Sequence, residues 1–353
     1  MEITVKQAAA ILEKIVANRI AGGNPPPAML WGPPGIGKSA IINSIAKKLN
    51  LELRDIRLAQ LDPVDLRGIP TVENAQTKWA VPSFFPQEED SAGIMFLDEL
   101  SAADQSIQVA AYQLLLDRRI GDYKIPDKWV IFAAGNRAED NSVSLPMSAA
   151  LANRMMHLEL HADPEEWARW ASKNSIDPNV IGFIRFAPEM LFDMGECGER
   201  GWPSPRSWDN VSRISSAGLS EEDLASCVSG LVGDAAAMQF LSYRRQAKTF
   251  GNIRELMLMP DSKLKIENKP DLCYAAASAL AYWVWKGENE LEAQALLDGF
   301  FRCIAQLPPA FAAIAMIDAM EKSQDDSNAE KLMTHPEFIK WQERCGEEFD
   351  RRR

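Results

Sequence analysis

Apolar runs and helical repeats alternate along residues 1–161 of the chain. Apolar residues recur every three to four positions over 4–20 and 40–49, a spacing that predicts amphipathic helices, and a short helix is expected over 145–152. Apolar or alternating segments bounded by turn-forming residues predict strands at 28–31, 51–56, 93–97, 129–134 and 155–160. Strands and helices in alternation are typical of an α/β domain with a parallel sheet.

The segments between these elements carry turn signals. Residues 62–68 predict a loop with capping residues, and the Pro-rich stretch 69–90 predicts irregular structure or a hairpin. Residues 118–127 predict a second, short hairpin, and a helix is expected to begin at Ser101. The aromatic residues of the Pro-rich stretch are Trp79, Phe84 and Phe85. These rings either pack over the core of the domain or present one of their number to a channel.

Beyond residue 161 the apolar pattern is helical. The candidates for the core of this part are Trp167, Trp170, Phe183, Ile184 and Phe186. Farther along, we expect apolar helices over 275–285 and 291–307, a polar loop over 321–330 and a charged helix over 338–353. The chain is therefore expected to form an α/β domain over 1–161, a helical domain over 162–255 and a helical extension over 256–353.

The strongest chemical signal lies where the first strand meets the following helix. This segment matches the pattern Gly-x-x-x-x-Gly-Lys-Ser and comprises Gly32, Pro33, Pro34, Gly35, Ile36, Gly37, Lys38, Ser39 and the helical Ala40. Glycines let backbone N–H groups turn inward, and the start of a helix adds partial positive charge. Lys38 can reach the β- and γ-phosphates of a nucleotide, and the Ser39 hydroxyl can ligate Mg²⁺. The segment therefore predicts a binding site for ATP with Mg²⁺.

Two carboxylates follow the apolar run at 93–97. Asp98 and Glu99 stand at the expected carboxyl end of a parallel strand, the edge at which open α/β sheets bind ligands. Asp98 can hold Mg²⁺ through water, and Glu99 can orient and deprotonate an attacking water molecule. Asn136 follows the strand at 129–134 and can position the same water if that strand neighbours the first one.

Composition narrows the class of protein. The net charge of −12 over 353 residues argues against a surface that binds duplex DNA throughout, although a local basic channel remains compatible with it. No apolar stretch is long enough for a membrane span, and the first residues lack the features of a signal peptide. Five dispersed cysteines indicate neither a zinc site nor a disulfide framework, so a cytoplasmic location is expected. His157 and His161 lie on an alternating strand, which argues against a metal pair.

Taken together, these motifs resemble those of the AAA+ ATPases and, in finer detail, the MoxR family. The resemblance covers about residues 1–215. It rests on Gly-Pro-Pro-Gly-Ile-Gly-Lys-Ser, Asp-Leu-Arg-Gly, Phe-Leu-Asp-Glu-Leu, Ala-Ala-Gly-Asn-Arg and Leu-Ala-Asn-Arg-Met. It implies a parallel sheet sandwiched by helices, followed by an all-helical lid and a helical C-terminal extension.

The resemblance also implies roles for several arginines. Arg154 matches the finger that reaches into a neighbouring subunit's site, although Asn153 and Met155 replace the usual Asp and Phe of that motif. Arg206 matches the arginine that the lid contributes to the bound nucleotide. The pair Arg118 and Arg119 either contacts a neighbouring subunit or is a solvated helix end, where cations are favoured.

The implied activity is hydrolysis of ATP. Glu99 would be the base, Asn136 would position the water, and Lys38 and Arg154 would stabilise the developing charge. The family further implies a ring, expected to be a hexamer, that remodels or matures a partner protein, with a von Willebrand A-type protein as the expected partner. One alternative is a nucleic-acid-dependent motor or translocase, which the negative charge disfavours. Another is a nucleotide-gated switch with negligible turnover, which the presence of Glu99 disfavours.

Overall fold

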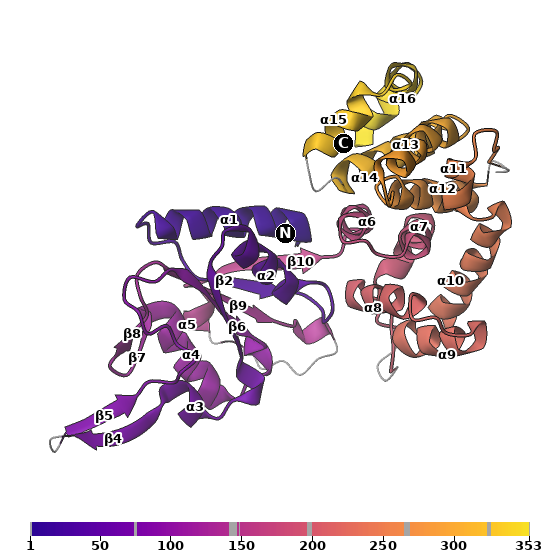
Figure 1. The fold of residues 1–353 in the computed structure, drawn as a ribbon. Coiled ribbons are helices and arrows are strands. Elements are labelled where there is room, and N and C mark those ends of the chain that lie inside the picture. The colour runs from indigo at the N-terminus through magenta and orange to yellow at the C-terminus, as the bar shows by residue number, and fades with distance from the viewer. Residues whose placement is uncertain are drawn as a thin grey trace. The chain divides into compact units, whose positions relative to one another are not determined.

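The computed structural model describes residues 2–73, 76–140, 147, 149–195, 200–264, 269–322 and 326–352. The chain divides into two compact units, unit 1 over Met1–Ala162 and unit 2 over Asp163–Arg353 (Figure 1). None of the helices in the described ranges combines the length and the apolar character needed to cross a lipid bilayer.

Within its described residues, unit 1 is built on a six-stranded, fully parallel sheet with the order β1-β10-β2-β9-β6-β3. These strands are β1 (Glu2–Thr4), β2 (Ala28–Trp31), β3 (Glu52–Arg57), β6 (Gly93–Asp98), β9 (Trp129–Gly135) and β10 (Met156–His161). The helices of unit 1 are α1 (Val5–Ile20), α2 (Lys38–Lys48), α3 (Pro63–Arg67), α4 (Gln105–Asp117) and α5 (Ala149–Ala152). Each of the five predicted strands is present, and the predicted α/β fold is confirmed.

Helices cover both faces of this sheet. Alternate strand residues such as Leu30 and Phe96 pack against α1 and α2 in one buried cluster. Their neighbours Met29 and Leu97 face the other side and pack with Leu66 of α3 and Leu114 of α4. Because side chains alternate across a strand, sheet residues buried on both faces read as nearly continuous apolar runs in the sequence.

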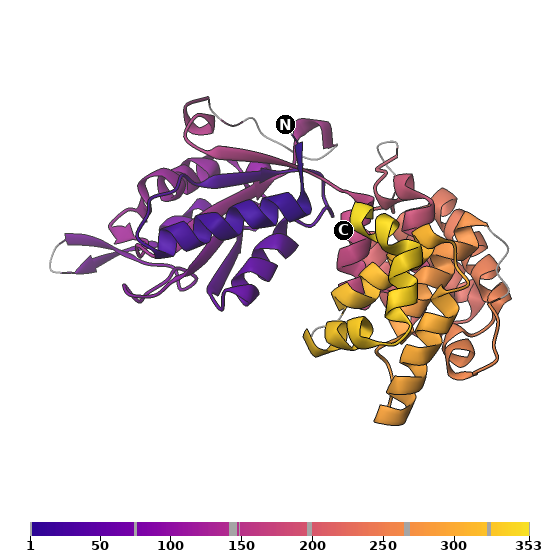
Figure 2. The same cartoon turned by 90° about the horizontal axis from the view of Figure 1, so that it is seen from above.

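Two hairpins extend unit 1. One consists of β4 (Ile69–Glu73) and β5 (Gln76–Ala80), and it protrudes from the rest of the unit (Figures 1 and 2). The other is β7 (Arg119–Ile120) with β8 (Tyr123–Lys124). Both hairpins were expected. Among the aromatic residues of 69–90, Phe85 is fully buried, whereas Trp79 on β5 is 40% exposed, so the role of Trp79 at a channel stays a prediction.

Unit 2 is helical in its described residues. Its helices are α6 (Pro164–Lys173), α7 (Pro178–Phe186), α8 (Pro205–Ser215), α9 (Glu221–Val232), α10 (Asp234–Ala247), α11 (Ile253–Leu258), α12 (Pro270–Trp283), α13 (Glu290–Ile304), α14 (Pro309–Lys322), α15 (Asp326–Thr334) and α16 (Phe338–Arg352). One apolar cluster joins α11 to α16 and includes Phe300 and Trp341, while Phe183, Trp208 and Phe240 form an aromatic cluster between α7, α8 and α10. The boundary expected between residues 255 and 256 stays a prediction.

Several local predictions were wrong. The sequence pattern missed β1, because three residues are too few to show a period, and it assigned 62–68 to a loop although α3 forms there, with the Asp65 carboxylate accepting from the Asp62 N–H at 2.9 Å. The helix expected at Ser101 is preceded by a 3₁₀ turn (Leu100–Ala102), and α4 begins only at Gln105. Trp170 and Phe186 are 43% and 45% exposed, so they are not core residues.

Two predicted segments fall partly outside the described residues. Of the helix expected over 145–152, the structure describes residue 147 and α5. Of the polar loop expected over 321–330, residues 323–325 lie outside the described residues, and the remainder is helical because α14 ends at Lys322 and α15 begins at Asp326.

Candidate functional site

A glycine-rich loop joins the buried strand β2 to α2. The backbone dihedral φ is +153° at Gly32, +84° at Gly35 and +115° at Gly37, all in the region that side chains with a Cβ rarely adopt. A Cβ on Gly32 would also lie 3.2 Å from the carbonyl oxygen of Leu160 on the neighbouring strand. The loop therefore needs its glycines to turn tightly and to bring the N-terminus of α2 to the sheet edge, where its N–H groups favour an anion.

Lys38, the first residue of α2, is the cation of this loop. Its side chain is only 9% exposed, and its Nζ donates to the carbonyl oxygens of Gly32 at 2.5 Å and Pro33 at 3.1 Å. Nζ also donates to Oδ1 of Asn136 at 2.8 Å. The last contact requires that β9 neighbour β2, and the two strands do pair, with Gly135 opposite Trp31. From the sequence, Asn136 was expected to lie beside the phosphates only if its strand neighboured the first strand. The two strands are neighbours.

Ser39 and Asp98 meet on the other side of the loop. The Ser39 hydroxyl donates to Oδ2 of Asp98 at 2.7 Å, and Oδ1 of Asp98 accepts from the Glu99 N–H at 2.9 Å. A hydroxyl and a carboxylate are hard oxygen donors of the type that Mg²⁺ prefers, and both stand beside the phosphate loop. The donor set fits a Mg²⁺ ion held together with the phosphates of a nucleotide.

Glu99 follows the last residue of β6 in a left-handed conformation, with φ of +59°. This conformation costs a non-glycine residue about 1–2 kcal/mol, and such strain clusters at functional sites. The carbonyl oxygen of Glu99 accepts from the Ala102 N–H at 3.0 Å, which closes the turn after the strand. Glu99 itself is exposed, so its carboxylate is accessible to water beside Asp98.

Ser101 is a positioning residue that the sequence reasoning treated only as part of a helix cap. Its hydroxyl accepts from the Asn136 N–H at 3.0 Å and donates to the Asn136 carbonyl oxygen at 3.1 Å. Gly135 permits this approach, because a Cβ there would lie 2.7 Å from Oγ of Ser101. The two residues are 35 positions apart, and no periodicity or motif in the sequence links them. Ser101 thus fixes the backbone that carries the amide of Asn136.

Negative charge accumulates at this edge of the sheet. Burial raises the pKa of Asp55 on β3, and the charges of Asp98 and Glu99 raise it further, while Arg57 acts in the opposite direction. The carboxylates at this edge therefore repel one another, and Arg57 offsets part of that repulsion.

Arg154 lies at the amino ends of the strands, opposite the carboxyl ends where the phosphate loop is. It is exposed and precedes β10, whose first residue, Met156, pairs with Ala28 at the start of β2. Gly32 lies four residues beyond Ala28, which is roughly 13 Å along the strands at about 3.3 Å per residue. Arg154 is one of the residues that line a pocket there. The structure therefore does not bring Arg154 to the phosphate loop of its own chain.

Arg206 belongs to unit 2, where it is exposed in the first turn of α8. The Ser204 hydroxyl caps that helix by accepting from the Ser207 N–H at 3.1 Å. Arg206 is not among the residues that unit 1 brings together, and its contribution to nucleotide binding stays a prediction.

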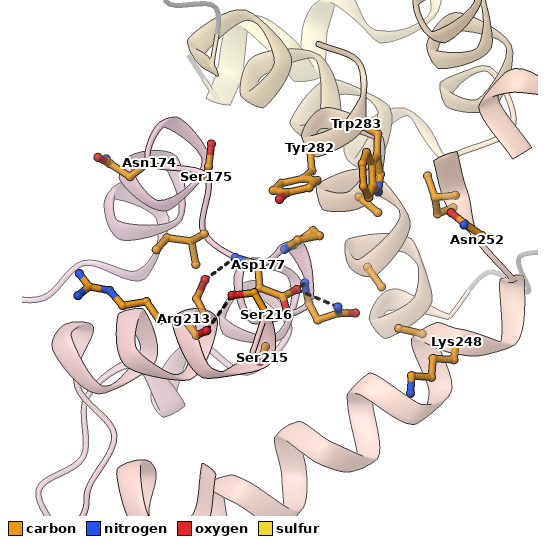
Figure 3. Close-up of a pocket in the computed structure, with 18 of the residues that line it drawn as sticks. Asn174, Ser175, Asp177, Arg213, Ser215, Ser216, Lys248, Asn252, Tyr282 and Trp283 are labelled. Atoms are coloured by element: carbon orange, nitrogen blue, oxygen red, sulfur yellow. Dashed lines mark hydrogen bonds between the residues drawn. The ribbon is translucent and has the colours of Figure 1, made fainter. Parts of the chain in front are cut away.

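A pocket of about 730 Å³ lies within unit 2 (Figure 3). Its walls include Asp177 at the start of α7, Arg213 of α8, and Tyr282 and Trp283 of α12. None of the residues predicted from the sequence to bind nucleotide lines it. Several of its polar groups are paired within the protein; for example, the Asp177 N–H donates to Oγ of Ser212 at 2.8 Å.

Of the histidine pair expected not to bind metal, His157 makes contacts within the protein. Nδ1 of His157 accepts from Nε1 of Trp31 at 2.8 Å, and its Nε2 lies 2.8 Å from the carbonyl oxygen of Ala152. Within the described ranges, no group of three or more His, Cys, Asp or Glu side chains is placed to hold a metal ion. Four of the cysteines are free thiols, and Cys197 lies outside the described residues.

Comparison with known proteins shows what part of this chain is similar to. Residues 27–155 match the family model for the AAA domain (dynein-related subfamily). A midasin from Giardia intestinalis is 27% identical over 199 residues, which cover 53% of this chain and 4% of the midasin. The replication factor C small subunit of Methanocella arvoryzae is 34% identical over 91 residues, which cover 26% of this chain and 28% of that protein. The chain thus spans less than a third of the length of either relative.

Among solved structures, the Holliday junction branch migration motor RuvB of Thermotoga maritima matches with a TM-score of 0.38 and 15% sequence identity, over 72% of this chain and 73% of that chain. The family match over residues 27–155 contains the phosphate loop, the Asp98 strand end, Asn136 and Arg154. Together with the parallel sheet and its glycine-rich loop, the match shows that residues 27–155 of this chain are similar to the AAA domain of the dynein-related subfamily.

Proposed function

We propose that this protein is an ATPase of the AAA+ class and that unit 1 binds ATP with Mg²⁺ and hydrolyses it. The observation that carries the proposal is the convergence of Lys38, Asn136, Ser39 and Asp98 at one sheet edge through hydrogen bonds of 2.7 and 2.8 Å. Asp98 ends β6, Asn136 follows the neighbouring strand β9, and Lys38 and Ser39 open α2. Each of the four has a chemical role in phosphoryl transfer.

The nucleotide would replace contacts that the loop now makes with itself. Nζ of Lys38 donates to two carbonyl oxygens of the loop and to Asn136, and each of these donations can pass to the β- and γ-phosphates. The Ser39 hydroxyl would turn from Asp98 to Mg²⁺, which Asp98 would hold through water. Ser39 and Asp98 would hold the ion, which would neutralise part of the negative charge of the phosphates.

For hydrolysis, we assign Glu99 as the base and Asn136 as the group that positions the water. The water oxygen attacks the γ-phosphorus, its proton passes to the Glu99 carboxylate, and the bond from the γ-phosphorus to the bridging oxygen breaks, giving ADP and phosphate. Ser101 supports this step by holding both backbone groups of Asn136. Lys38 stabilises the charge that develops on the transferred phosphoryl group.

Arg154 supplies the remaining charge from a second copy of the chain. Its place at the amino ends of the strands, roughly 13 Å along the sheet from its own loop, supports a role outside its own subunit's site. A finger in trans requires a head-to-tail assembly, which closes into a ring when the rotation permits. By resemblance to the MoxR family, we propose a hexameric ring that remodels or matures a partner protein, with a von Willebrand A-type protein as the first candidate. Arg206 of unit 2 would complete the nucleotide site.

The proposal is tested with the purified full chain. Phosphate release from Mg·ATP is compared between the parent, Glu99→Gln, Lys38→Ala and the control Glu88→Gln, which removes an exposed carboxylate away from the site. The proposal expects hydrolysis by the parent and the control, loss of hydrolysis with retained ATP binding in Glu99→Gln, and loss of binding in Lys38→Ala. Failure of Mg·ATP to bind the parent chain would refute the proposed function.

The partner is sought with the same variant. Glu99→Gln loaded with ATP should hold a partner protein that Lys38→Ala releases, because only the former keeps the nucleotide. Stimulation of the parent's hydrolysis by DNA, without any protein held by the Glu99→Gln trap, would replace partner remodelling with a nucleic-acid motor.

A further inference from the structure

The exposed side chain of His157 on β10 bridges two segments that belong to different parts of the candidate site. Its Nδ1 lies 2.8 Å from Nε1 of Trp31, the last residue of β2 before the phosphate loop. Its Nε2 lies 2.8 Å from the carbonyl oxygen of Ala152, which ends α5 two residues before Arg154. One side chain thus connects the strand that enters the phosphate loop with the turn that carries Arg154.

The chemistry of the two partners fixes the tautomer of the imidazole. The indole Nε1 of Trp31 can only donate, so Nδ1 of His157 accepts and carries no proton. The carbonyl oxygen of Ala152 can only accept, so Nε2 of His157 carries the proton and donates it. The two rings also stack, with centroids 6.1 Å apart and planes inclined by 18°. Hydrogen bonds therefore run in one direction, from Trp31 through the imidazole to Ala152.

The register of the sheet explains why these groups meet. β10 pairs with β2, and His157 stands opposite Met29, with Trp31 two residues farther along β2 (Figure 1). Residues two apart on a strand share a face, so the rings of Trp31 and His157 lie on the same side of the sheet. The hydrogen bonds therefore lead from the carboxyl ends of the strands, where the phosphate loop lies, toward the amino ends, where Arg154 lies.

The turn that carries Arg154 closes on the carbonyl oxygen of Ala152. That oxygen accepts from the Met155 N–H at 3.3 Å as well as from Nε2 of His157. Beyond Arg154 the chain is anchored, because Met155 is buried among apolar side chains and β10 begins at the following residue. Before Arg154, a side chain of the sheet holds the turn through the Ala152 carbonyl. His157 thus helps to fix the backbone from which Arg154 projects.

The exposure of Arg154 makes this support consequential. An arginine that serves a phosphate in another subunit depends on the direction in which its backbone presents it. A misplacement of about 1 Å can lower the rate of a reaction by about 10²-fold, even where the change lies away from the reacting atoms.

We propose that His157 is a positioning residue for Arg154, and that it ties the placement of Arg154 to the phosphate loop of its own subunit through Trp31. The proposal rests on the proposed function, in which Arg154 serves a second copy of the chain. The alternative is that His157 only stabilises the fold of unit 1, and the experiments separate these two roles.

Two substitutions isolate the hydrogen bonds of His157. His157→Phe keeps a flat ring beside Trp31 but removes both nitrogen atoms, whereas His157→Gln supplies an acceptor and a donor on one amide. The matched control is His335→Phe in unit 2. His335 also stacks on an aromatic ring, with centroids 4.1 Å apart at Phe301, and its Nε2 lies 3.0 Å from Oδ1 of Asp298.

The first measurement needs no nucleotide. Hydrogen exchange of the full chain, followed by mass spectrometry, reports the backbone N–H groups of residues 153–155. We expect exchange there to become about 10-fold faster in His157→Phe, because loss of the hydrogen bond lets the turn open. His157→Gln and the control His335→Phe should remain close to the parent. Unchanged exchange in His157→Phe would overturn the proposed support of the turn.

The second measurement is the turnover of Mg·ATP in a double-mutant cycle with Arg154→Ala. His157→Phe alone should lower kcat about 10-fold and leave KM for ATP unchanged, because its own phosphate loop is intact. In the Arg154→Ala background the same substitution should have no further effect, since no arginine is left to position. His157→Gln should recover part of the lost kcat, and His335→Phe should keep the kcat of the parent.

Trp31→Phe tests the tie to the phosphate loop. It removes the indole donor but keeps an aromatic ring in place. We expect it to lower kcat, and we expect the double variant with His157→Phe to be no slower than His157→Phe alone, because both substitutions break the same chain of hydrogen bonds. A kcat equal to that of the parent in Trp31→Phe would overturn this part of the proposal.

Two kinetic outcomes would overturn the positioning role itself. One is a fall in kcat with His157→Phe that is equally large with and without Arg154, since the effect would then belong to the fold. The other is an Arg154→Ala variant with the kcat of the parent, since Arg154 would then need no positioning. Both outcomes leave ATP hydrolysis by unit 1 standing, because that proposal fails only if the parent chain does not bind Mg·ATP.

Discussion

The ion pair between Arg185 of α7 and Asp318 of α14 is the sharpest stability test that unit 2 offers. Both side chains are about 1% exposed, and Oδ2 and Oδ1 of Asp318 accept from Nη1 and Nη2 of Arg185 at 2.6 and 2.8 Å. Burial by itself lowers the pKa of Arg185, but the charge and the hydrogen bonds of Asp318 overcome this and raise it above its ordinary value. Asp318 therefore stabilises the buried positive charge of Arg185, which burial alone would disfavour.

Replacing one partner should lower the free energy of unfolding much more than replacing both. Asp318→Leu leaves a buried guanidinium that cannot lose its proton, and breaking such a pair typically costs 3–5 kcal/mol. Glu165, 3.5 Å from Nη2 and 43% exposed, still offsets part of the charge, so we expect a loss of about 3 kcal/mol. The double variant Arg185→Met with Asp318→Leu should fall within about 1 kcal/mol of the parent, because apolar side chains then fill the same space.

The assay is urea unfolding of the full chain at pH 7, followed by circular dichroism, for the parent, both single variants and the double variant. The matched control is Arg351→Met, which breaks a pair of 2.8 Å between Arg351, itself 70% exposed, and Glu348, and should cost less than about 0.5 kcal/mol. The reasoning is refuted if Asp318→Leu costs no more than this control, or if the two single losses simply add in the double variant.

Of three further predictions, two concern the candidate site and the third concerns the half-buried amine of Lys322. Glu99→Gln should lower the turnover of ATP by about 10²–10⁴-fold and leave the dissociation constant for ATP unchanged, which steady-state kinetics and equilibrium binding would check; unchanged turnover would remove Glu99 as the base. Ser101→Ala should lower kcat more than it changes KM, because it releases the backbone of Asn136; an effect on KM alone would contradict a positioning role. Burial, assisted by Lys286, lowers the pKa of Lys322 to about 8 from 10.5, so folding disfavours its charged form. The parent should therefore gain stability relative to Lys322→Met, on the order of 1 kcal/mol, as pH rises from about 8 to about 10.5, and urea midpoints that move in parallel over this range would contradict the shift.

The sequence revealed those features of the site that are formed by residues close together along the chain. The phosphate loop is a single contiguous segment whose glycines, lysine and serine are fixed by one strand-to-helix turn, so a pattern in the sequence captured it. Asp98 was recognised because a carboxylate at the end of an apolar run is also a local feature. Ser101 was missed as a positioning residue because its partner Asn136 lies 35 residues away, and only the neighbouring strands bring the two together.

The sequence by itself determined the alternation of strands and helices, the phosphate loop and the acidic strand end, because each depends on residues within one or two turns of chain. Only the tertiary structure decided that Lys38 meets Asn136, 98 residues away, and that Arg154 lies at the strand ends opposite its own loop. It also decided that Arg118 lines a pocket with Arg19 and donates to the carbonyl oxygen of Pro126, where sequence position alone allowed a solvated helix end. The physical reason is that strand order sets which chain segments are neighbours, and the pairing of parallel strands is a property of the whole sheet that no short segment encodes.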